Sequence, residues 1–478
     1  MVGRVLKRTA RKGFIHGRVA LLLGLLASGA WLSRARAQDS PYQNHLVGER
    51  ALGFAGAFVG VADDPSAIFH NPGGIATLDT SALAGSLWAV VRGARQLENG
   101  YRTALGNGSL DFSSALSLPL FLSGVIKFGN KTEDGLRPHA LGAALFSPHQ
   151  KDYRFVEQLD DAGGVDRLEV RHRDSSRWLG LTYGYRPRYG LSLGLSAFLA
   201  GRSLSHDEVE IRAREQIPVE STVGSTVTRA GTLEVNTRHL VLRVGTLLHV
   251  THELHAGIML QIPGIELSGS ADAEYLDTSV GPNPTSITIQ RNSGMEGNLP
   301  LPWELRMGIT ILRPPDALLT LDLSLFGPVG SGSDPVELVS EDARLGLFMA
   351  PRTHTRPSLR CALGFETVLA GIVPLRGGAF FQRSAAPELP ETSDVYMVDH
   401  IGYVGAAFSV GLRTSGYDFA VGASAEIGWG DGLAVVRAAD PTAAPSYALS
   451  SLEESRFMIF IGGARSAVRT LVRTLLED

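Results

Sequence analysis

The feature that most constrains this chain is an alternation of apolar and polar residues with a period of two. Across residues 303–311 every odd position is apolar and every even position is polar or small, and residues 319–325 and 419–429 follow the same rule. A period of two places successive side chains on opposite faces of a β-strand. Each segment therefore presents one apolar face, and we expect an all-β chain.

The connections between the alternating segments indicate which all-β architecture to expect. A pass along the chain finds fourteen such segments, most of them nine to thirteen residues long, close to the roughly 9–11 residues that a tilted strand needs to cross a bilayer. Short connections such as 187–190 and 251–254 alternate with long polar ones such as 148–176 and 204–237. Short turns at one end and long loops at the other are typical of outer-membrane barrels. We expect a transmembrane antiparallel β-barrel of about 14 strands over residues 80–463.

A soluble β-sandwich or propeller is the alternative, because its strands would turn the same apolar faces into a core. Neither fold predicts alternating short and long connections over the whole chain. Aromatic residues make up only 7% of the sequence. Even so, Trp178, Tyr183, Tyr185, Trp303 and Trp429 lie near segment ends, where a membrane barrel carries its aromatic girdles.

The first 37 residues have the organisation of a secretory signal peptide. They contain eight of the 44 Lys and Arg residues, no Asp or Glu, an apolar run over residues 19–32, and the small residues Ala35 and Ala37 around a cleavage position. A membrane anchor is the alternative, but a run of fourteen residues falls short of the roughly 20 that a spanning helix needs. We expect residues 1–37 to be a cleaved signal peptide and the chain to be exported to the outer membrane of a Gram-negative cell.

Composition excludes several classes of function. Beyond residue 37 the chain has 36 basic against 48 acidic residues, which argues against a nucleic-acid partner. The single cysteine, Cys361, can form neither an internal disulfide nor a thiolate metal site. The pattern G-x-S-x-G around Ser192 lies inside an alternating segment, whereas a nucleophile elbow needs a strand-to-helix turn. The 13 histidines have no metal-ligand spacing. We expect no catalytic residue, no metal and no cofactor.

Residues 38–79 precede the first alternating segment and do not have the pattern of a strand. Asp63, Asp64 and Pro65 are suited to start a short helix at Pro65, and Asn71-Pro72-Gly73-Gly74 is a turn sequence. A barrel of about 14 strands has a lumen too wide for its own side chains to fill. We therefore expect these residues to form a compact plug, or hatch, in the lumen. A disordered leader is the alternative, but the low charge and the aromatic residues of the segment argue against it.

The polar positions of the alternating segments are expected to face the lumen, because the apolar positions face lipid. We expect most of the charged residues there to pair with one another. These residues are Arg243, Glu304, Arg306, Asp322, Glu366, Arg413 and Glu426. An arginine among them is a candidate to bind a carboxylate on a substrate, but strand parity does not identify which one.

Residues 464–478 are expected to form an amphipathic helix after the last strand. Val468, Leu471, Val472 and Leu475 recur at helical spacing. Such a helix can lie on the inner leaflet or pack against the mouth of the barrel, and both interpretations stay open.

The N-terminal segment resembles the opening of the FadL/TodX family of outer-membrane transporters for hydrophobic compounds. The resemblance rests on Gly48-Glu49-Arg50-Ala51-Leu52-Gly53, on Asp63-Asp64-Pro65-Ser66-Ala67 and on Asn71-Pro72-Gly73-Gly74. Residues 301–308 and 375–380 also look like that family. Other outer-membrane barrels, including the PorV-like secretion components, open in a similar way.

The resemblance implies a barrel of about 14 strands with an N-terminal hatch in its lumen. It also implies that the protein carries long-chain fatty acids or aromatic hydrocarbons. It implies that the turn at residues 71–74 belongs to the hatch and that Phe54, Phe58 and Phe69 face its apolar, substrate-binding pocket. Two features depart from the family. Gly73-Gly74 stands where the family usually has Ala-Gly, and the chain ends after the expected helix instead of in a strand closed by an aromatic residue.

The sequence therefore predicts an outer-membrane transport protein for hydrophobic solutes. The expected partners are a hydrophobic small molecule, outer-membrane lipid and the barrel assembly machinery, and the barrel is expected to be a monomer. The alternative is a barrel that acts as a docking or secretion-system component without transport.

Overall fold

The computed structural model describes residues 46–114, 120–132, 135–161, 163–214, 224–281, 285–313, 317–329, 349, 355–414, 416–440 and 443–466. For residues 88–92, 113, 114, 120 and 466 only the backbone is described. The expected signal peptide and the first residues of the expected hatch lie outside the described residues. So does the expected C-terminal helix, apart from residues 464–466, which belong to the last strand.

The helices of the described residues are three short segments near the N-terminus, and everything else with regular structure is strand. The helices are α2 (Glu49–Gly53), α3 (Ala67–His70) and η1 (Pro72–Thr77). The first strands are β1 (Ala82–Thr103), β2 (Gly106–Ser114), β3 (Leu120–Phe128), β4 (His139–Asp161), β5 (Gly164–Arg188), β6 (Leu191–Arg214), β7 (Ser225–His249), β8 (Leu254–Gln261) and β9 (Ile265–Val280). The remaining strands are β10 (Ser286–Met295), β11 (Glu304–Arg313), β12 (Ala317–Phe326), β13 (Ser358–Leu369), β14 (Val373–Gln382), β15 (Thr392–Ser393), β16 (His400–Arg413), β17 (Tyr417–Val436) and β18 (Ser446–Ser466).

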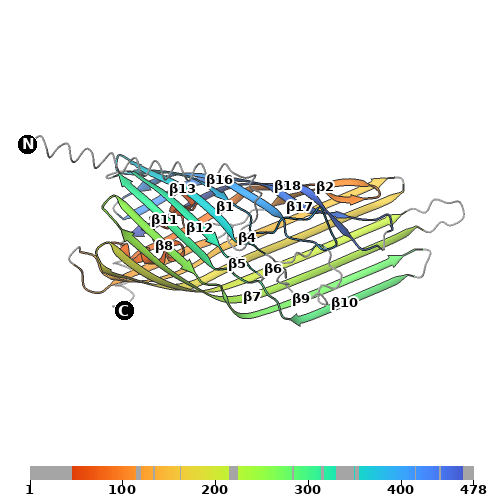
Figure 1. Cartoon of the computed structure of the whole chain (residues 1–478), viewed down its shortest axis with the longest axis horizontal. Helices are drawn as coiled ribbons and strands as arrows, with labels where there is room; N and C mark the ends of the chain where they lie inside the picture. Colours follow the sequence, from red (N-terminus) through yellow and green to blue (C-terminus); the bar gives the residue numbers. More distant parts are fainter. Residues whose placement is uncertain are drawn as a thin grey trace, which may run out of the picture. The chain divides into compact units, whose positions relative to one another are not determined.

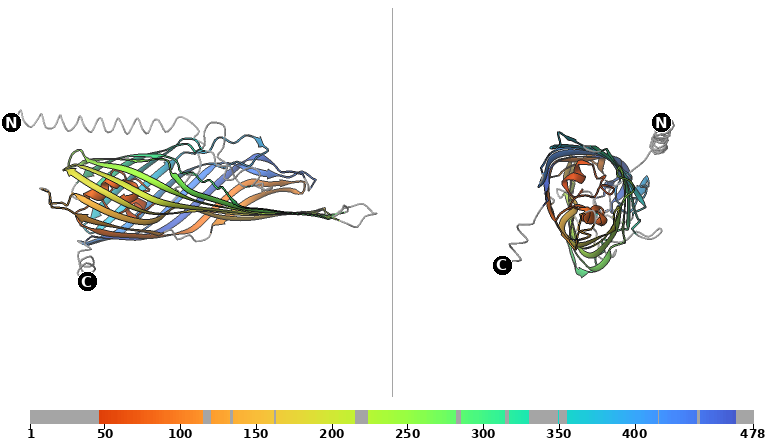
Figure 2. Two further views of the ribbon diagram at one scale, coloured as in Figure 1. Left: turned by 90° about the horizontal axis from the view of Figure 1, so that it is seen from below. Right: turned by 90° about the vertical axis from the view of Figure 1, so that its left-hand side faces the viewer.

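These strands close into a barrel (Figure 1 and Figure 2). Antiparallel pairing runs from β1 through β3–β8 and β11–β14 to β16, β17 and β18, which pairs with β1 and completes the ring. Three positions in the wall are divided along their length, into β2 with β3, β8 with β9, and β10 with β11. With the two-residue β15 the described wall counts 15 strands, so the expected all-β barrel is confirmed and its strand number differs only slightly from expectation.

The connections expected to be long polar loops are in large part continuations of the strands. β4 and β5 stay paired as far as Asp161 and Gly164, and β6 and β7 stay paired as far as Arg214 and Ser225. The hydropathy pattern fades there because the outward face leaves the membrane and meets water, so both faces become polar while the backbone ladder continues. The sequence pattern therefore showed where the membrane ends rather than where the strands end.

The outward face carries a band of exposed apolar side chains. On β5, Leu179 is 57% exposed and Leu181 63% exposed, followed by Tyr183 and Tyr185. Trp178, expected in an aromatic girdle, is instead fully buried inside the barrel. The reason is parity, because even-numbered residues of β5 face the lumen. None of the helices in the described part of the chain has the length and apolar character that a membrane span requires.

The N-terminal helices lie inside the ring. The view along the barrel in Figure 2 shows this segment, in red and orange, enclosed by the strands. Its residues share one buried apolar cluster with the inward face of the wall, including Ile68 and Phe69 of α3 together with Phe146 and Phe198 of β4 and β6. Residues 46–81 are called the hatch below.

Candidate functional site

The Asn-Pro-Gly-Gly turn fixes the hatch to the wall. The Asn71 side-chain amide donates to the carbonyl of Val59 within the hatch at 3.0 Å and to that of Thr246 on β7 at 2.9 Å. Its carbonyl oxygen accepts the N–H of Gly73 at 3.2 Å and so begins η1. A single asparagine thus satisfies backbone groups of three segments that would otherwise be buried without partners.

Glycines allow the backbones of hatch and wall to approach each other closely. A Cβ on Gly74 would lie 2.0 Å from the carbonyl oxygen of Ala62, and one on Gly194 of β6 would lie 2.2 Å from Pro72. At Gly73 the nearest atoms are 3.0 Å away. Gly74 therefore has no room for a side chain, whereas Gly73, where the resembling family has alanine, is merely crowded.

Two aspartates hold the backbone of the hatch. Asp64 accepts from the N–H and the hydroxyl of Ser66 at 2.7 and 2.6 Å, and α3 begins at Ala67, two residues later than expected. Asp322 of β12 accepts from the N–H groups of Phe58 and Val59 at 2.6 Å each. Burial raises the pKa of Asp64 to about 6.

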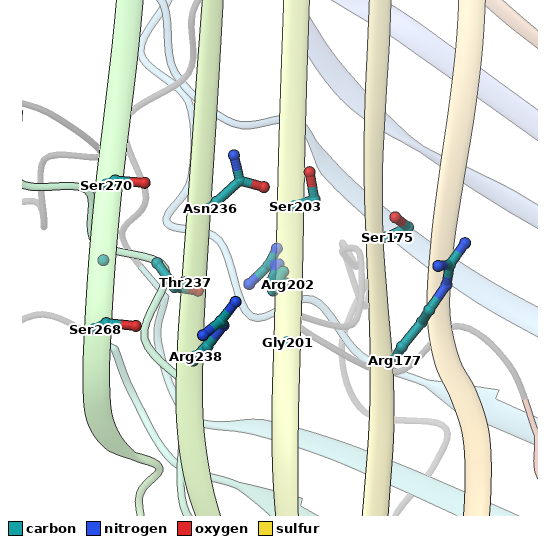
Figure 3. Close-up of a pocket in the computed structure, with 11 residues that line it drawn as sticks. Ser175, Arg177, Gly201, Arg202, Ser203, Asn236, Thr237, Arg238, Ser268 and Ser270 are labelled. Atoms are coloured by element: carbon teal, nitrogen blue, oxygen red, sulfur yellow. The ribbon is translucent and has the colours of Figure 1, made fainter. Parts of the chain in front are cut away.

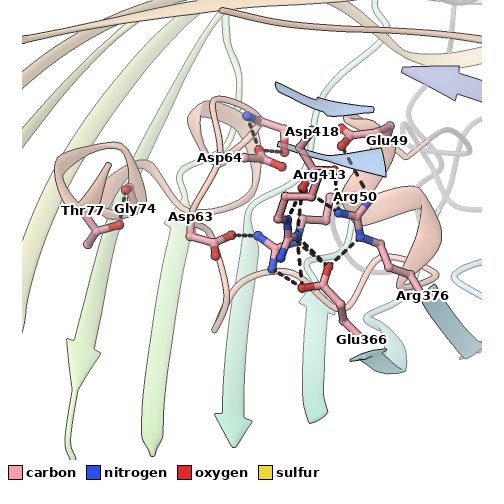
Figure 4. A network of polar contacts seen from close by, with 11 residues as sticks. Glu49, Arg50, Asp63, Asp64, Gly74, Thr77, Glu366, Arg376, Arg413 and Asp418 are labelled. Carbon is pink, nitrogen blue, oxygen red and sulfur yellow. Dashed lines mark hydrogen bonds and ion pairs between the residues drawn. The ribbon is translucent and has the colours of Figure 1, made fainter. Parts of the chain in front are cut away.

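A network of arginines and carboxylates joins α2 to four strands (Figure 4), and we call it the hatch anchor. Arg50 of α2 donates through two nitrogens to both oxygens of Glu366 at 3.1 Å and also pairs with Asp63. Arg376 donates to Glu366 at 2.6 Å and to Asp418 at 2.9 Å. The members of the hatch anchor are Glu49, Arg50, Asp63, Glu366, Arg376, Arg413 and Asp418.

Most of the hatch anchor is shielded from water, so its charges depend on one another. The Arg376 side chain has no exposed surface and that of Glu366 is 5% exposed. Removing one partner from such a pair leaves an uncompensated buried charge. Glu49 lies 3.8 Å from Arg376, yet burial, together with the charge of Asp64, raises the pKa of Glu49 to about 8.

A second charged group lies under α3. The Arg243 guanidinium stacks on the Phe69 ring with 4.0 Å between its carbon and the ring centroid, and it donates to the Phe69 carbonyl. It also donates to Gln261 at 2.8 Å and faces Glu304 at 3.4 Å. Arg306 pairs with the same Glu304. Arg243 therefore fixes the end of α3 by charge, hydrogen bond and ring contact at once.

His70 completes this group as a neutral side chain. Its Nε2 lies 2.7 Å from the Val47 carbonyl and must be the donor, so its Nδ1 accepts from Arg306 at 3.3 Å. Burial and the neighbouring Arg306 lower the pKa of His70 well below its usual value. Its protonation state is therefore fixed over the physiological pH range.

The three phenylalanines proposed to bind substrate are all fully buried. Phe69 packs on Phe146 with 5.0 Å between ring centroids, and Phe54 lies 6.2 Å from Phe58. The two cavities described below are lined by other residues. A pocket at these rings would therefore require the hatch to move, and their role in binding stays a prediction.

The opposite end of the barrel is closed by a second apolar cluster, called the mouth cluster. At this end, Tyr101 and Arg102 at the end of β1 pair in parallel with Val435 and Val436 at the end of β17. The mouth cluster comprises Leu97, Tyr101, Leu110, Phe112, Phe155, Leu168, Val170, Met349, Ile401, Tyr403, Leu433, Val435, Tyr447 and Leu452. A cavity of about 10 Å³ beside it holds about one water molecule.

Two arginines lie beside the apolar clusters with different partners. Arg95, near the mouth cluster, pairs with Asp399 and with Glu454, the latter at 3.3 Å. Arg360 of β13 lies beside the hatch, where it donates to the Ala55 carbonyl at 3.1 Å and stacks on Phe380 at 4.2 Å. Among the residues that the structure describes, no carboxylate pairs with Arg360.

The structure places the charged lumen candidates as follows. Arg243, Glu304 and Arg306 meet beneath α3, Asp322 holds residues 58 and 59, Glu366 and Arg413 belong to the hatch anchor, and Glu426 pairs with Arg456 at 3.0 Å. Ser192 lies within β6 with its side chain buried. Within the described ranges, no group of three or more His, Cys, Asp and Glu side chains is arranged to hold a metal ion.

Sequence reasoning missed Arg50, Arg376 and Asp418 as members of the hatch anchor. Strand parity was sufficient to direct Arg376 inward, because Leu375 beside it faces outward. Nothing in the sequence indicated that Arg50 would lie against Glu366, since 316 residues separate them.

Comparison with solved structures identifies the fold. The chain is similar to the CymD monoaromatic hydrocarbon channel, with 15% identity, a TM-score of 0.53, and 88% of this chain and 97% of that chain covered. It is also similar to the toluene transporter TodX of P. putida (11% identity, TM-score 0.55, 88% of this chain and 98% of that chain covered). A FadL homologue of Pseudomonas aeruginosa matches at 12% identity and a TM-score of 0.51, with 89% of this chain and 99% of that chain covered.

No protein-family model matches the chain, and no curated protein matches its sequence. The FadL/TodX resemblance seen in the sequence is thus confirmed at the level of the fold, that of outer-membrane channels. These neighbours are named as channels and transporters rather than enzymes.

Proposed function

We propose that this barrel transports hydrophobic solutes across the outer membrane. The observation that carries the proposal is the mouth cluster, fourteen buried apolar residues inside the upper barrel. A water-filled porin has a polar lumen. Exposing a hydrophobic solute to that water costs roughly 25 cal/mol of free energy per Å² of apolar surface, and an apolar interior avoids this cost. The fold shared with named hydrocarbon channels supports the same solute class.

The proposed path has two apolar binding regions. A solute is captured at the mouth cluster once packed rings such as Phe112 and Phe155, 4.7 Å apart between centroids, separate to admit it. It then passes to the hatch, where Phe54, Phe58 and Phe69 form its binding pocket once the hatch shifts. Release follows through a gap in the wall or past the displaced hatch. The hatch anchor joins hatch and wall through charges that water can solvate when they separate, which supports a hatch that moves as a unit.

Charge distribution suggests where a solute with a carboxylate would bind. Arg95 already faces Asp399 and Glu454, so the mouth favours uncharged compounds. Arg360 stands beside Phe380 and the hatch with carbonyl and amide partners only, among the described residues. We therefore assign a fatty-acid carboxylate to Arg360, which was not among the arginines that strand parity offered as candidates. Those three, Arg243, Arg306 and Arg413, all pair with carboxylates.

The experiment that tests this function is a fluorescence titration of the detergent-purified mature protein with a fatty-acid probe, followed by oleate uptake into liposomes. We expect saturable binding that is lost in a variant carrying Phe58→Asp and Phe69→Asp. Heat-modifiable migration on gels checks that the variant barrel is still folded. Arg360→Gln should weaken oleate binding about tenfold or more and leave toluene binding unchanged, while Arg360→Lys should retain most of the affinity.

The same assays distinguish transport from a docking role. A docking barrel would show no saturable binding, and its liposomes would take up oleate no faster than protein-free vesicles. Equal loss of oleate and toluene binding in Arg360→Gln would remove the carboxylate assignment and leave the transport proposal in place.

A further inference from the structure

The outward face of the barrel carries a polar recess that the proposed transport path does not use. It has a volume of about 660 Å³ and lies over β5, β6, β7 and β9 (Figure 3). Cross-strand pairing sets Arg177, Gly201, Arg238 and Ser268 in one row across these strands. The adjoining row consists of Asn236 and three serines. An outward recess on a wall that otherwise presents leucines requires an explanation.

The recess lies directly at the edge of the apolar band. The next row toward the short turns is Leu179, Leu199, Leu240 and Ile265, which are paired across the same four strands. Three of them are exposed by 48 to 57%. Because the short turns of such barrels face the periplasm, this edge is the outer boundary of the membrane. Lipid acyl chains therefore meet the leucine row, and lipid headgroups meet the recess.

The charge of the recess is unbalanced. Arg177 and Arg238 are both exposed, and neither has an acidic partner among the described residues. None of the eleven residues that line the recess is acidic. Figure 3 shows Arg238 at β7 and Arg177 rising from β5 on the side away from Gly201, with Gly201 and Arg202 between the two arginines. Acidic side chains, Glu234 and Asp272, come only one row further from the membrane, beyond Asn236.

The centre of the recess is open because of Gly201. A Cβ there would meet only the carbonyl oxygen of Arg177, at 3.9 Å. Adjacent strands lie about 4.8 Å apart, so the backbones that carry Arg177 and Arg238 are roughly 10 Å apart across β6. Arginine side chains are long enough to reach a tetrahedral anion over the glycine from both sides, and Arg177 does so once it turns from its position in Figure 3 toward Gly201. Arginine and hydroxyl groups are the usual ligands of phosphate.

We propose that this recess binds the phosphate of a lipid headgroup in the outer leaflet, with the lipid's acyl chains on the leucine row below. Arg177 and Arg238 contact the phosphate, the serines and Asn236 donate hydrogen bonds, and Gly201 provides the space. The arrangement fixes the barrel's depth in the membrane on the side of β5 to β9, independently of what passes through the lumen.

Native mass spectrometry of the detergent-purified mature protein tests the proposal. The probes are lipid A with its phosphates, the same lipid with the phosphates removed, and inorganic phosphate as a competitor. The test variant is Arg177→Gln with Arg238→Gln. The matched control is Arg171→Gln with Arg188→Gln, which changes the same net charge at exposed positions of β5 outside the recess. Heat-modifiable migration verifies that each variant is folded.

We expect the phosphorylated lipid to bind about thirtyfold more weakly to the test variant, because each arginine near an anionic surface contributes about a factor of five. The control variant should stay within about twofold of the wild type. Equal binding of the dephosphorylated lipid, or equal weakening in the control, would overturn the proposal. Displacement of the phosphorylated lipid by millimolar inorganic phosphate would also overturn the proposal, since the site would then bind free phosphate.

Discussion

At the scale of single residues, the interior of this barrel is organised by charges that are paired between hatch and wall. Arg50 and Glu366 meet across 316 residues of sequence, and Arg243 meets the Phe69 ring and carbonyl. Both contacts are buried, so each is sensitive to the loss of one partner. Charged pairs of this kind hold a hatch in one position and still allow it to separate from the wall, because water can solvate the separated charges when the hatch moves.

Glu366→Gln is expected to loosen the hatch. The substitution leaves Arg50 and Arg376 without their shared carboxylate and should cost about 3 kcal/mol, or roughly a hundredfold in the protection of α2 amides. Hydrogen exchange followed by mass spectrometry measures this protection. Glu453→Gln, an exposed position on β18, is the control and should change little. Unaltered α2 protection in Glu366→Gln would show that the hatch anchor does not hold the hatch.

The protection of the hatch should also fall as the pH rises. The pKa of Glu49 is raised by burial from its ordinary value of 4.5 to about 8. A carboxyl whose folded pKa is raised contributes stability that is complete below its unfolded pKa and is lost as the pH rises through its folded pKa. Exchange of α2 amides, corrected for intrinsic rates, should therefore show protection decreasing between about pH 5 and pH 9. Glu49→Gln should flatten this profile, and a flat profile in the wild type would contradict the assignment.

At the scale of elements, the fit of the hatch depends on glycines of the wall rather than on large side chains. Gly194 of β6 lies against Pro72 of η1, and Gly257 of β8 lies against the carbonyl of Val59. Extended strands with a glycine on the inward face present bare backbone, against which the turns of the hatch can rest. The strands thus provide a shaped surface as well as a wall.

Gly194→Ala should displace η1, because the new Cβ would lie 2.2 Å from Pro72. Overpacking of this kind costs about 1–3 kcal/mol, and the exchange of η1 and α3 amides should quicken accordingly. Gly201→Ala on the same strand is the matched control, since its Cβ would have its nearest contact at 3.9 Å. If both variants exchanged alike, the close approach at Gly194 would have no energetic consequence.

At the scale of the whole molecule, the barrel is closed at both ends by different means. The hatch fills the end with short turns, and the buried side chains of the mouth cluster fill the other. Arg437, just after β17, donates to both oxygens of Glu210 on β6 at 2.6 and 2.5 Å, and Tyr101 of β1 donates to the same carboxylate at 3.2 Å. The Glu210 carboxylate thus connects β6 with β1 and with the residue that follows β17.

Planar-bilayer recording should show no porin-sized conductance for the wild-type barrel, because both closures block the lumen. Arg437→Gln should produce brief openings, since it leaves Glu210 buried with fewer charged partners. Arg154→Gln breaks an exposed ion pair with Glu169 on the same extracellular extension and, as a surface pair worth at most about 1 kcal/mol, should leave the current unchanged. Identical traces from the two variants would show that Glu210 and Arg437 do not control the mouth.

The elements that depend on local pattern could be predicted from the amino-acid sequence. The period of two and the parity of residues such as Glu304 and Arg306 follow from strand geometry, and the Asn-Pro-Gly-Gly turn follows from the backbone preferences of its residues. The parity of β5 also directs Trp178 inward. Which inward charges meet, and how far β4 to β7 stay paired beyond the apolar band, became visible in the tertiary structure alone. The reason is that ion pairs such as Arg50 with Glu366 join residues 316 positions apart, and that strands whose two faces are both polar carry no alternation from which their length could be predicted.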